Sequence, residues 1–310
     1  MQLNREDSAR SGIVAGLLAY LWWGLVTALY YRELDQVHVL ELISWRALGG
    51  LPICLAILAM PPGLSRLREA MRSPGALRMH GASVAMLVGN WFVFIYAVRE
   101  ERLTEASLGY FLNPLVSVLL GRFFLGEKLV GRQGWALGLA GVGVVVFAAS
   151  LWRGSGNFLE GFVWIPLVLA LSFGFYGLLR KQMTADSITG LTIEVLLIFP
   201  FFLGIELWLM REGVAAIGRG DPGLDFLLLA GGLVTVVPLA LFGFAAQRLR
   251  LSTVGLLQYV SPTCQFILAV LVFGEPLTAG RLIAFLLIWS ALGLYSRESW
   301  LVARLGAARP

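Results

Sequence analysis

Residues 102–127 read RLTEASLGYFLNPLVSVLLGRFFLGE, and residues 250–275 read RLSTVGLLQYVSPTCQFILAVLVFGE. Each stretch begins with Arg-Leu, carries a proline at its thirteenth position and ends with Gly-Glu, and the two lie 148 residues apart. A run of ~20 mostly apolar residues is long enough to cross the ~30 Å hydrocarbon core of a bilayer. The repeated pattern therefore predicts two related membrane spans, one in each half of the chain.

The composition of the whole chain favours a membrane protein. Of its 310 residues, 58% are hydrophobic and 14% are charged, whereas about 25% of the residues in an average soluble domain are charged. So few charges cannot cover a soluble body of this apolarity. The formal net charge of +5 has no soluble domain to carry it, and we expect no nucleic-acid partner.

Ten apolar stretches follow one another along the chain. They cover about residues 12–31, 38–60, 79–98, 104–125, 133–151, 159–179, 189–209, 224–246, 252–273 and 281–297. The offset of 148 relates the first five to the last five, which predicts two units, residues 12–151 and 159–297, in one membrane domain without a soluble domain. Because five is odd, the second unit enters from the opposite side, as in the inverted repeats of transporters. The predicted fold is all-α, with ten transmembrane helices in two inverted five-helix repeats.

Lysine and arginine predict the orientation. Fifteen of the 24 basic side chains fall on the side of the two termini, seven fall on the other side, and Arg46 and Arg122 lie within spans. Cytoplasmic loops carry the excess of basic residues in membrane proteins. We therefore expect both termini in the cytoplasm.

The repeated stretches each carry a polar face. At i, i+3 and i+7 lie Tyr110, Asn113 and Ser117 in the first and, 148 residues later, Gln258, Ser261 and Gln265. This spacing places three side chains on one side of a helix. Each face adjoins a proline, Pro114 or Pro262, which frees a backbone carbonyl and is a candidate hinge. We predict a substrate cavity between the two faces; the alternative is hydrogen bonding that only holds the helices together.

Two charged residues lie deep in spans. Arg46 has Glu194 as its counterpart 148 residues later, and Glu41 lies five residues before Arg46, about 140° away around a helix. Ionisable residues at such depth rarely face lipid. They either form structural contacts, such as a buried ion pair, or bind substrate or a coupled proton, for which Glu41 and Glu194 are the candidates.

Aromatic and amide side chains add further candidates. These are Tyr20 and Trp23 in the first span, Asn90 and Trp91 in the third, and Tyr176 in the sixth. Rings with a few polar groups suit the pocket of a small amphipathic molecule, although Trp and Tyr also gather at membrane interfaces. Gly134 and Gly138 form G-x-x-x-G, a close-packing pattern, and we assign it to packing within the fold or in a homodimer.

Several function classes lack their sequence signatures. The chain has no Walker A sequence, no TVGYG-like filter and no HExxH, and its two cysteines, Cys54 and Cys264, lie in apolar runs. Its two histidines, His38 and His80, offer little for a metal site. We therefore expect no cofactor, no metal and no enzyme activity.

Specific segments resemble the RarD family, in the EamA branch of the drug/metabolite transporter superfamily. They are residues 105–115 (EASLGYFLNPL), Gly126-Glu127, Gly89-Asn90-Trp91, residues 248–253 (RLRLST), Gln258-Tyr259 and Pro262-Thr263. The resemblance implies ten helices in two inverted repeats, the bacterial inner membrane, and export of a small molecule by alternating access. It also implies that helices 1–4 and 6–9 surround the cavity, with helices 5 and 10 behind.

The sequence thus predicts a secondary transporter that exports a small amphipathic metabolite or drug across the lipid bilayer. A facilitative uniporter, an importer and a channel remain open. So does a membrane sensor or assembly protein built on a transporter scaffold. Substrate, direction, coupling ion and oligomeric state do not follow from the residues alone.

Overall fold

The computed structural model describes residues 2–100, 102–129, 132–152, 164–272, 274 and 278–307, and over these residues the chain is helical without strands. The elements are α1 (Gln2–Leu21), η1 (Trp22–Val26), α2 (Thr27–Glu33), α3 (Val39–Leu48), α4 (Gly50–Leu58), α5 (Gly63–Arg72), α6 (Pro74–Arg99), α7 (Leu103–Leu125), α8 (Gln133–Trp152), α9 (Trp164–Gln182), α10 (Ser187–Arg211), α11 (Pro222–Arg248), α12 (Leu251–Leu257), α13 (Val260–Leu271) and α14 (Ala279–Ala307).

Eight helical segments of the described chain are long and apolar enough to cross a membrane. They are α1 to α2, α3 to α4, α6, α7, α8, α10, α11, and α12 to α13. The predicted span 159–179 corresponds to α9, but residues 159–163 lie outside the described residues. The predicted span 281–297 corresponds to α14, whose apolar part, Ala279–Tyr295, is shorter than the eight. The protein is a multi-pass, all-helical membrane protein.

Local sequence signals set the helix ends. Ser73 accepts a hydrogen bond from the backbone N–H of Ala76 at the start of α6, and Asp221 caps α11 in the same way. Such side chains satisfy backbone donors that have no partner within the helix. The two glycines of the repeated Gly-Glu pair, Gly126 and Gly274, both have a left-handed φ, 63° and 67°, which terminates a helix at little cost. Glu275 lies outside the described residues.

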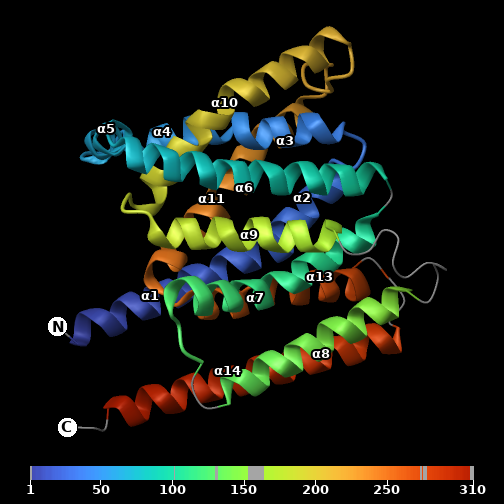
Figure 1. The fold of residues 1–310 in the computed structure, drawn as a ribbon. Coiled ribbons are helices and arrows are strands. Elements are labelled where there is room, and N and C mark those ends of the chain that lie inside the picture. The colour runs from blue at the N-terminus through green and yellow to red at the C-terminus, as the bar shows by residue number, and fades with distance from the viewer. Residues whose placement is uncertain are drawn as a thin grey trace.

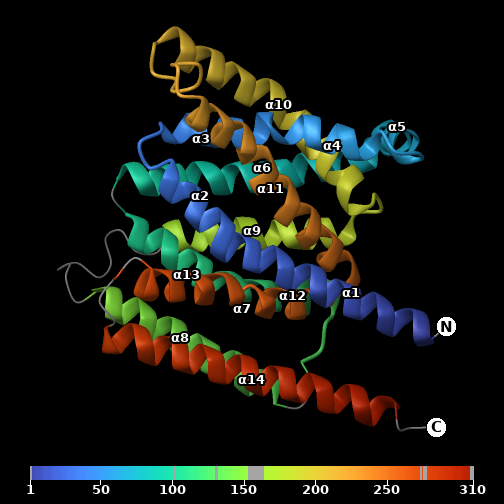
Figure 2. The same cartoon turned by 180° about the vertical axis from the view of Figure 1, so that it is seen from behind.

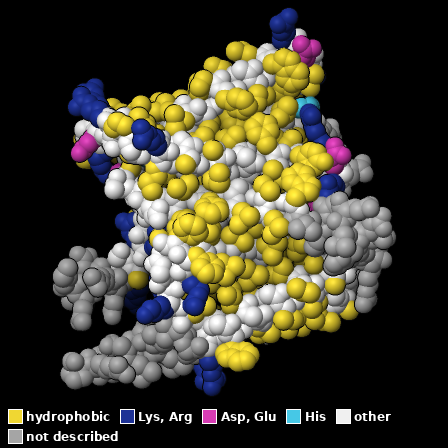
Figure 3. Space-filling model, in the orientation of Figure 1, with side chains coloured by type: hydrophobic (Ala, Val, Ile, Leu, Met, Phe, Trp, Pro, Cys, Tyr) yellow, Lys and Arg dark blue, Asp and Glu magenta, His cyan; other side chains and the backbone are white. Residues whose placement is uncertain are grey.

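The helices lie side by side as one bundle (Figure 1). α8 and α14 form a close pair along one edge, α1 packs along α11, and α6 packs along α9 (Figures 1 and 2). The beginning of α1 and the end of α14 lie at the same end of the bundle. Hydrophobic side chains cover the middle of the face seen in Figure 3, and Lys and Arg lie toward its edges. This distribution suits a bundle whose middle faces lipid.

The glycine-rich face of α8 is divided between two surroundings. A Cβ atom at Gly134 or Gly138 would have nothing within 4 Å, whereas a Cβ at Gly143 would lie 2.9 Å from Ile288 of α14. Among the described residues, the α8–α14 contact therefore uses Gly143 and leaves the G-x-x-x-G pair on the outer face. The expected homodimer stays a prediction.

One helix crossing depends on two glycines. Gly49 lies between α3 and α4, and a Cβ atom at Gly232 of α11 would overlap the backbone of Gly49. Because neither backbone can move away without shifting a whole span, we expect Gly232→Ala to lower the free energy of unfolding by about 2–3 kcal/mol or more. Gly204→Ala is the matched control, since a Cβ there meets nothing within 4 Å.

Fluorescence-detected size-exclusion chromatography after heating measures both variants. The expected result is a lower melting temperature for Gly232→Ala and an unchanged or higher one for Gly204→Ala. Equal melting temperatures would show that α3, α4 and α11 do not approach so closely.

Candidate functional site

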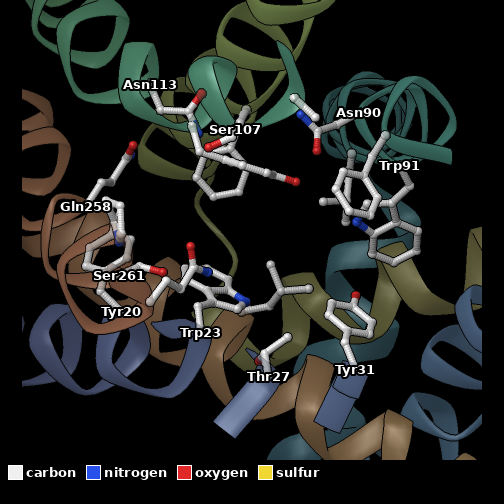
Figure 4. A pocket seen from close by; sticks show the side chains of 18 of the residues that line it. Tyr20, Trp23, Thr27, Tyr31, Asn90, Trp91, Ser107, Asn113, Gln258 and Ser261 are labelled. Atoms are coloured by element: carbon white, nitrogen blue, oxygen red, sulfur yellow. The ribbon is translucent and has the colours of Figure 1, made fainter. Parts of the chain in front are cut away.

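A cavity of about 360 Å³ lies within the bundle, in the size range of small-molecule sites. Its walls come from α1 to α3, α6, α7, α9, α11 and α12 to α13. The polar lining side chains converge on the cavity from several of these elements (Figure 4). The lining residues are Tyr20, Trp23, Thr27, Tyr31, Ile43, Arg46, Leu87, Asn90, Trp91, Phe94, Ala106, Ser107, Tyr110, Asn113, Phe173, Leu239, Gln258, Ser261, Pro262 and Gln265.

The lining includes ten of the thirteen candidate binding residues and one candidate hinge. The ten are Tyr20, Trp23, Arg46, Asn90, Trp91, Tyr110, Asn113, Gln258, Ser261 and Gln265, and the hinge is Pro262. The two polar faces, 148 residues apart in sequence, therefore meet at one cavity. Ser117, Glu194, Tyr176 and Pro114 are not among the lining residues.

Two amides supply unsatisfied hydrogen-bonding groups at the cavity. Oδ1 of Asn113 and Oε1 of Gln258 are buried and have no partner among the described residues. Nε2 of Gln258 donates to Oγ of Ser117 over 3.3 Å, so Ser117 contacts a lining residue from behind. A buried polar atom without a partner is costly, so a bound molecule that satisfied these two oxygens would gain affinity.

The amide nitrogen of Asn90 is already bonded within the protein. Nδ2 of Asn90 donates to the carbonyl of Leu169 and to Oγ of Ser172, each over 2.9 Å. Both partners lie in α9, so Asn90 connects α6 to α9. Asn90 lines the cavity, but its amide nitrogen binds to α9 and is not available to a ligand.

Arg46 is the charged residue of the cavity lining. Its side chain is mostly buried, Nε donates to Oγ1 of Thr235 over 2.8 Å, and Nη1 donates to the hydroxyl of Tyr31. Its guanidinium carbon lies 5.0 Å from the ring centroid of Trp91 and 5.5 Å from that of Tyr31. No carboxylate pairs with Arg46 in the described part of the chain.

Glu194 belongs to a separate buried cluster. Its carboxylate accepts hydrogen bonds from Arg180 over 3.3 Å, from Ser83 over 2.8 Å and from Tyr176 over 3.3 Å. Nδ1 of His80 lies 3.8 Å from it. The ion pair that the sequence allowed for Glu194 therefore exists, but its partner is Arg180 and not Arg46. Tyr176 serves this cluster and does not line the cavity.

Glu41 has a structural partner as well. Its carboxylate accepts the backbone N–H groups of Ala216, over 2.7 Å, and Ile217, over 2.9 Å, in the connection between α10 and α11. Glu41 and Arg46 lie about 140° apart around the helix, and they form no ion pair. Glu41 holds a loop in place at the end of the bundle.

The two proline-containing spans differ in shape. α7 runs without interruption through Pro114. The related span is divided at Gln258 and Tyr259, and Pro262 lies in the first turn of α13. Discontinuous helices at midplane sites occur in many transporters. The first span is also distorted, since η1 is a π-helical turn that contains the cavity residue Trp23 and directly precedes Thr27, and such turns are frequent at functional sites.

Sequence reasoning missed several lining residues, and helix periodicity points to some of them. Thr27 shares the predicted face of Tyr20 and Trp23, Tyr31 continues that face four residues later, and Ser107 lies three residues before Tyr110. Extending the predicted faces by one turn finds Tyr31 and Ser107. Apolar lining residues such as Phe173 and Leu239 carry no signal that separates them from the core.

The cavity extends from the middle of the bundle toward one end. Its residues on α2, α3 and α7 lie toward Glu33, Val39 and Leu103, which are the helix ends far from the termini. At the opposite end, the carboxylate of Glu127 accepts the N–H groups of Leu251, over 2.6 Å, and Ser252, over 3.0 Å. An anion at the start of α12 is favourable, and these bonds hold α7 and α12 together at this end, which we call the closed end because hydrogen bonds join its helices.

Lys181 and Gln247 add contacts at the same closed end. The ammonium of Lys181 donates to the carbonyls of Ala246, over 3.3 Å, and Leu249. Nε2 of Gln247 donates to the carbonyl of Ala185 over 2.7 Å. At this end, hydrogen bonds therefore join α7 to α12 and the end of α9 to the end of α11. The cavity lies between the middle of the bundle and the other end.

Comparison with known proteins identifies the family. The model of the EamA-like transporter family matches the chain twice, over residues 10–149 and over residues 159–297. The chain belongs to the EamA-like transporter family. The predicted family relationship is thereby confirmed, and the matches point to a membrane transporter rather than an enzyme.

The matches between this EamA-like protein and its relatives cover nearly the whole length of both chains. Protein RarD of Streptomyces exfoliatus is 38% identical over 308 residues, which cover 99% of this chain and 95% of that protein. A Vibrio cholerae protein called "Uncharacterized transporter" is 36% identical over 294 residues, 94% of this chain and 93% of that one. A crystal structure of another protein shares the fold, with a TM-score of 0.71 at 20% identity, covering 92% of this chain and 97% of that chain.

Proposed function

We propose that this EamA-like protein is a secondary transporter that exports a small amphipathic molecule by alternating access. The observation that carries the proposal is the position of the cavity. Its polar wall comes from two stretches 148 residues apart, with Asn113 on one and Gln258 on the other. A site between two related units can open to either side of the membrane as one unit moves past the other.

The packing of the helices supports two inverted five-helix repeats over residues 12–151 and 159–297. Under the offset of 148, α1 corresponds to α9, and α11 corresponds to α6. The contact between α1 and α11 therefore has its counterpart in the contact between α9 and α6, and both pairs pack closely. The two separate matches of the family model to residues 10–149 and 159–297 support the same division.

The direction of the cavity supports an outward-facing conformation. With both termini in the cytoplasm, as the basic residues predict, the closed end around Glu127 faces the cytoplasm. The cavity then lies toward the other side of the membrane, where an exporter releases its substrate. We place the protein in the inner membrane of a bacterium, because the relatives are bacterial proteins such as Protein RarD of Escherichia coli and an uncharacterized transporter of Vibrio cholerae.

Flux in proteoliposomes tests the proposal. We expect the purified protein to exchange a labelled solute for the same solute across the membrane. Asn113→Ala or Gln258→Ala should reduce the exchange rate at low substrate by about tenfold, since each removes about 1–1.5 kcal/mol of hydrogen bonding to bound substrate. Thr192→Val is the control, because Thr192 is buried, does not line the cavity and donates its hydroxyl to the carbonyl of Ile188 in its own helix.

The competing functions give different results in the same assay. A channel shows no acceleration of flux by substrate on the opposite side. A sensor or assembly protein shows no flux of any solute and retains specific partners during purification. Proton coupling through Glu41 or Glu194 stays a prediction, and a flux independent of the proton gradient would contradict it.

A further inference from the structure

Building on the proposed transport function, we infer that the cavity binds organic monoanions, each a carboxylate on an aromatic or apolar body. The carboxylate binds to Arg46, and the body lies among the rings of the cavity wall. The inference rests on three features of the cavity: its net charge, the partners of Arg46, and the distribution of its polar and aromatic groups.

The cavity carries one positive charge. Of its twenty lining residues, Arg46 is the basic one, and none is Asp, Glu, Lys or His. Coulomb attraction strengthens as the surroundings become less polar, and this wall is mostly rings and aliphatic side chains. The site therefore attracts an anion and offers no acidic side chain to a cation.

Arg46 keeps its whole charge available for a ligand. The Oγ1 of Thr235 and the hydroxyl of Tyr31, which accept from it, are both neutral. Nη2 makes no hydrogen bond to any described residue, and it is not among the fully buried unsatisfied atoms. A guanidinium has five donors in a planar fork that matches a carboxylate. Nη2 is thus a donor that a carboxylate in the cavity can reach.

The depth of Arg46 strengthens the same conclusion. It is 9% exposed, and a buried charge without an opposite charge is costly. Stacking on Trp91, at 5.0 Å, and Tyr31, at 5.5 Å, offsets part of this cost. A bound anion supplies the missing countercharge, so its binding offsets the remaining cost of burying the charge of Arg46.

The rest of the cavity suits the body of such an anion. Figure 4 shows Tyr31 and Trp91, the neighbours of Arg46, on one side and Asn113, Gln258 and Ser261 on the opposite side. The rings of Trp23, Phe94, Tyr110 and Phe173 belong to the same wall. An aromatic ring can lie between the two polar ends, and its distal hydroxyl or N–H would face the amides of Asn113 and Gln258.

Matched acids and amides test this inference on the purified full-length protein. The probes are indole-3-acetate and phenylacetate, each paired with its neutral carboxamide, and binding is measured at pH 7.5 by isothermal titration calorimetry and thermal shift. We expect each acid to bind roughly tenfold or more tightly than its amide, the usual benefit of a charge-assisted hydrogen bond. In Arg46→Gln the preference for the acid should disappear, while amide affinity changes less than about threefold.

Two variants serve as controls. Arg122→Gln removes an arginine from α7 that is exposed and does not line the cavity, and it should keep the full preference. Arg46→Lys retains the charge without the planar fork and should keep part of it. An arginine with a purely structural role would instead weaken acid and amide equally, and that result would overturn the inference.

The wild-type protein alone also decides the question if Arg46→Gln fails to fold. Equal or tighter binding of the amides, or no binding of any acid, overturns the inference. Exchange of a neutral solute without binding of any acid would overturn the inference of anion binding and leave the proposed transport function standing. Acid binding that depends on Arg46 without flux of any solute would instead overturn the transport function.

Discussion

Arg180→Met should lower the free energy of unfolding by about 3–5 kcal/mol, because it leaves the buried carboxylate of Glu194 without its countercharge. The side chains of Arg180 and Glu194 are 0% and 1% exposed. Nη2 of Arg180 also donates to the carbonyl of Ser187 over 2.7 Å, and the substitution removes that bond too. We expect most of the expressed variant to aggregate on extraction from the membrane.

A double variant separates charge imbalance from lost packing. Arg180→Met combined with Glu194→Gln removes both charges, so it should be more stable than Arg180→Met alone. Arg66→Gln is the matched control, because it breaks the pair with Asp186, whose side chains are 52% and 37% exposed. Exposed pairs contribute about 0–1 kcal/mol. Melting temperatures of the detergent-solubilised variants measure all three, and a double variant no more stable than Arg180→Met would contradict a charge effect.

This cluster also shows where sequence reasoning fails. The offset of 148 relates Arg46 to Glu194. Two related units are superimposed by a rotation about an axis, and equivalent residues contact each other only if they lie next to that axis. The true partner, Arg180, lies at the end of α9, near a predicted span boundary. Its long side chain reaches into the bundle, where Gly190 and Gly243 leave room for the guanidinium. No sequence pattern indicates that the Arg180 side chain extends into the bundle or that the two glycines leave room for it.

The cavity was more predictable, because it follows helix periodicity. Tyr110 and Asn113 share a face with period 3.6, and their counterparts Gln258 and Ser261 share another. Both faces line one cavity in the structure. Periodicity does not reveal that the second span is divided at Gln258 while the first stays continuous. Residues 109–117 and 257–265 share only the proline, and the repeated pattern does not indicate which of the two spans is divided.

A disulfide across the closed end should stop transport. A Cβ atom at Gly121 of α7 would lie 3.3 Å from the Cβ of Leu251 of α12, close to the ~3.5–4.5 Å found in disulfides. We therefore expect Gly121→Cys with Leu251→Cys to form a bond on oxidation, in a background with Cys54→Ala and Cys264→Ala. Exchange in proteoliposomes should fall by roughly tenfold or more and return on reduction, because α7 and α12 must separate for the closed end to open.

A second cysteine pair at the same Cβ–Cβ distance provides the control. A Cβ atom at Gly143 of α8 would also lie 3.3 Å from a Cβ, that of Leu287 of α14. This helix pair lies along one edge of the bundle and contributes no residue to the cavity lining. Gly143→Cys with Leu287→Cys should therefore become oxidised and still transport. Undiminished exchange by the fully oxidised Gly121–Leu251 variant would contradict alternating access, because a site that opens to both sides in turn requires this contact to break.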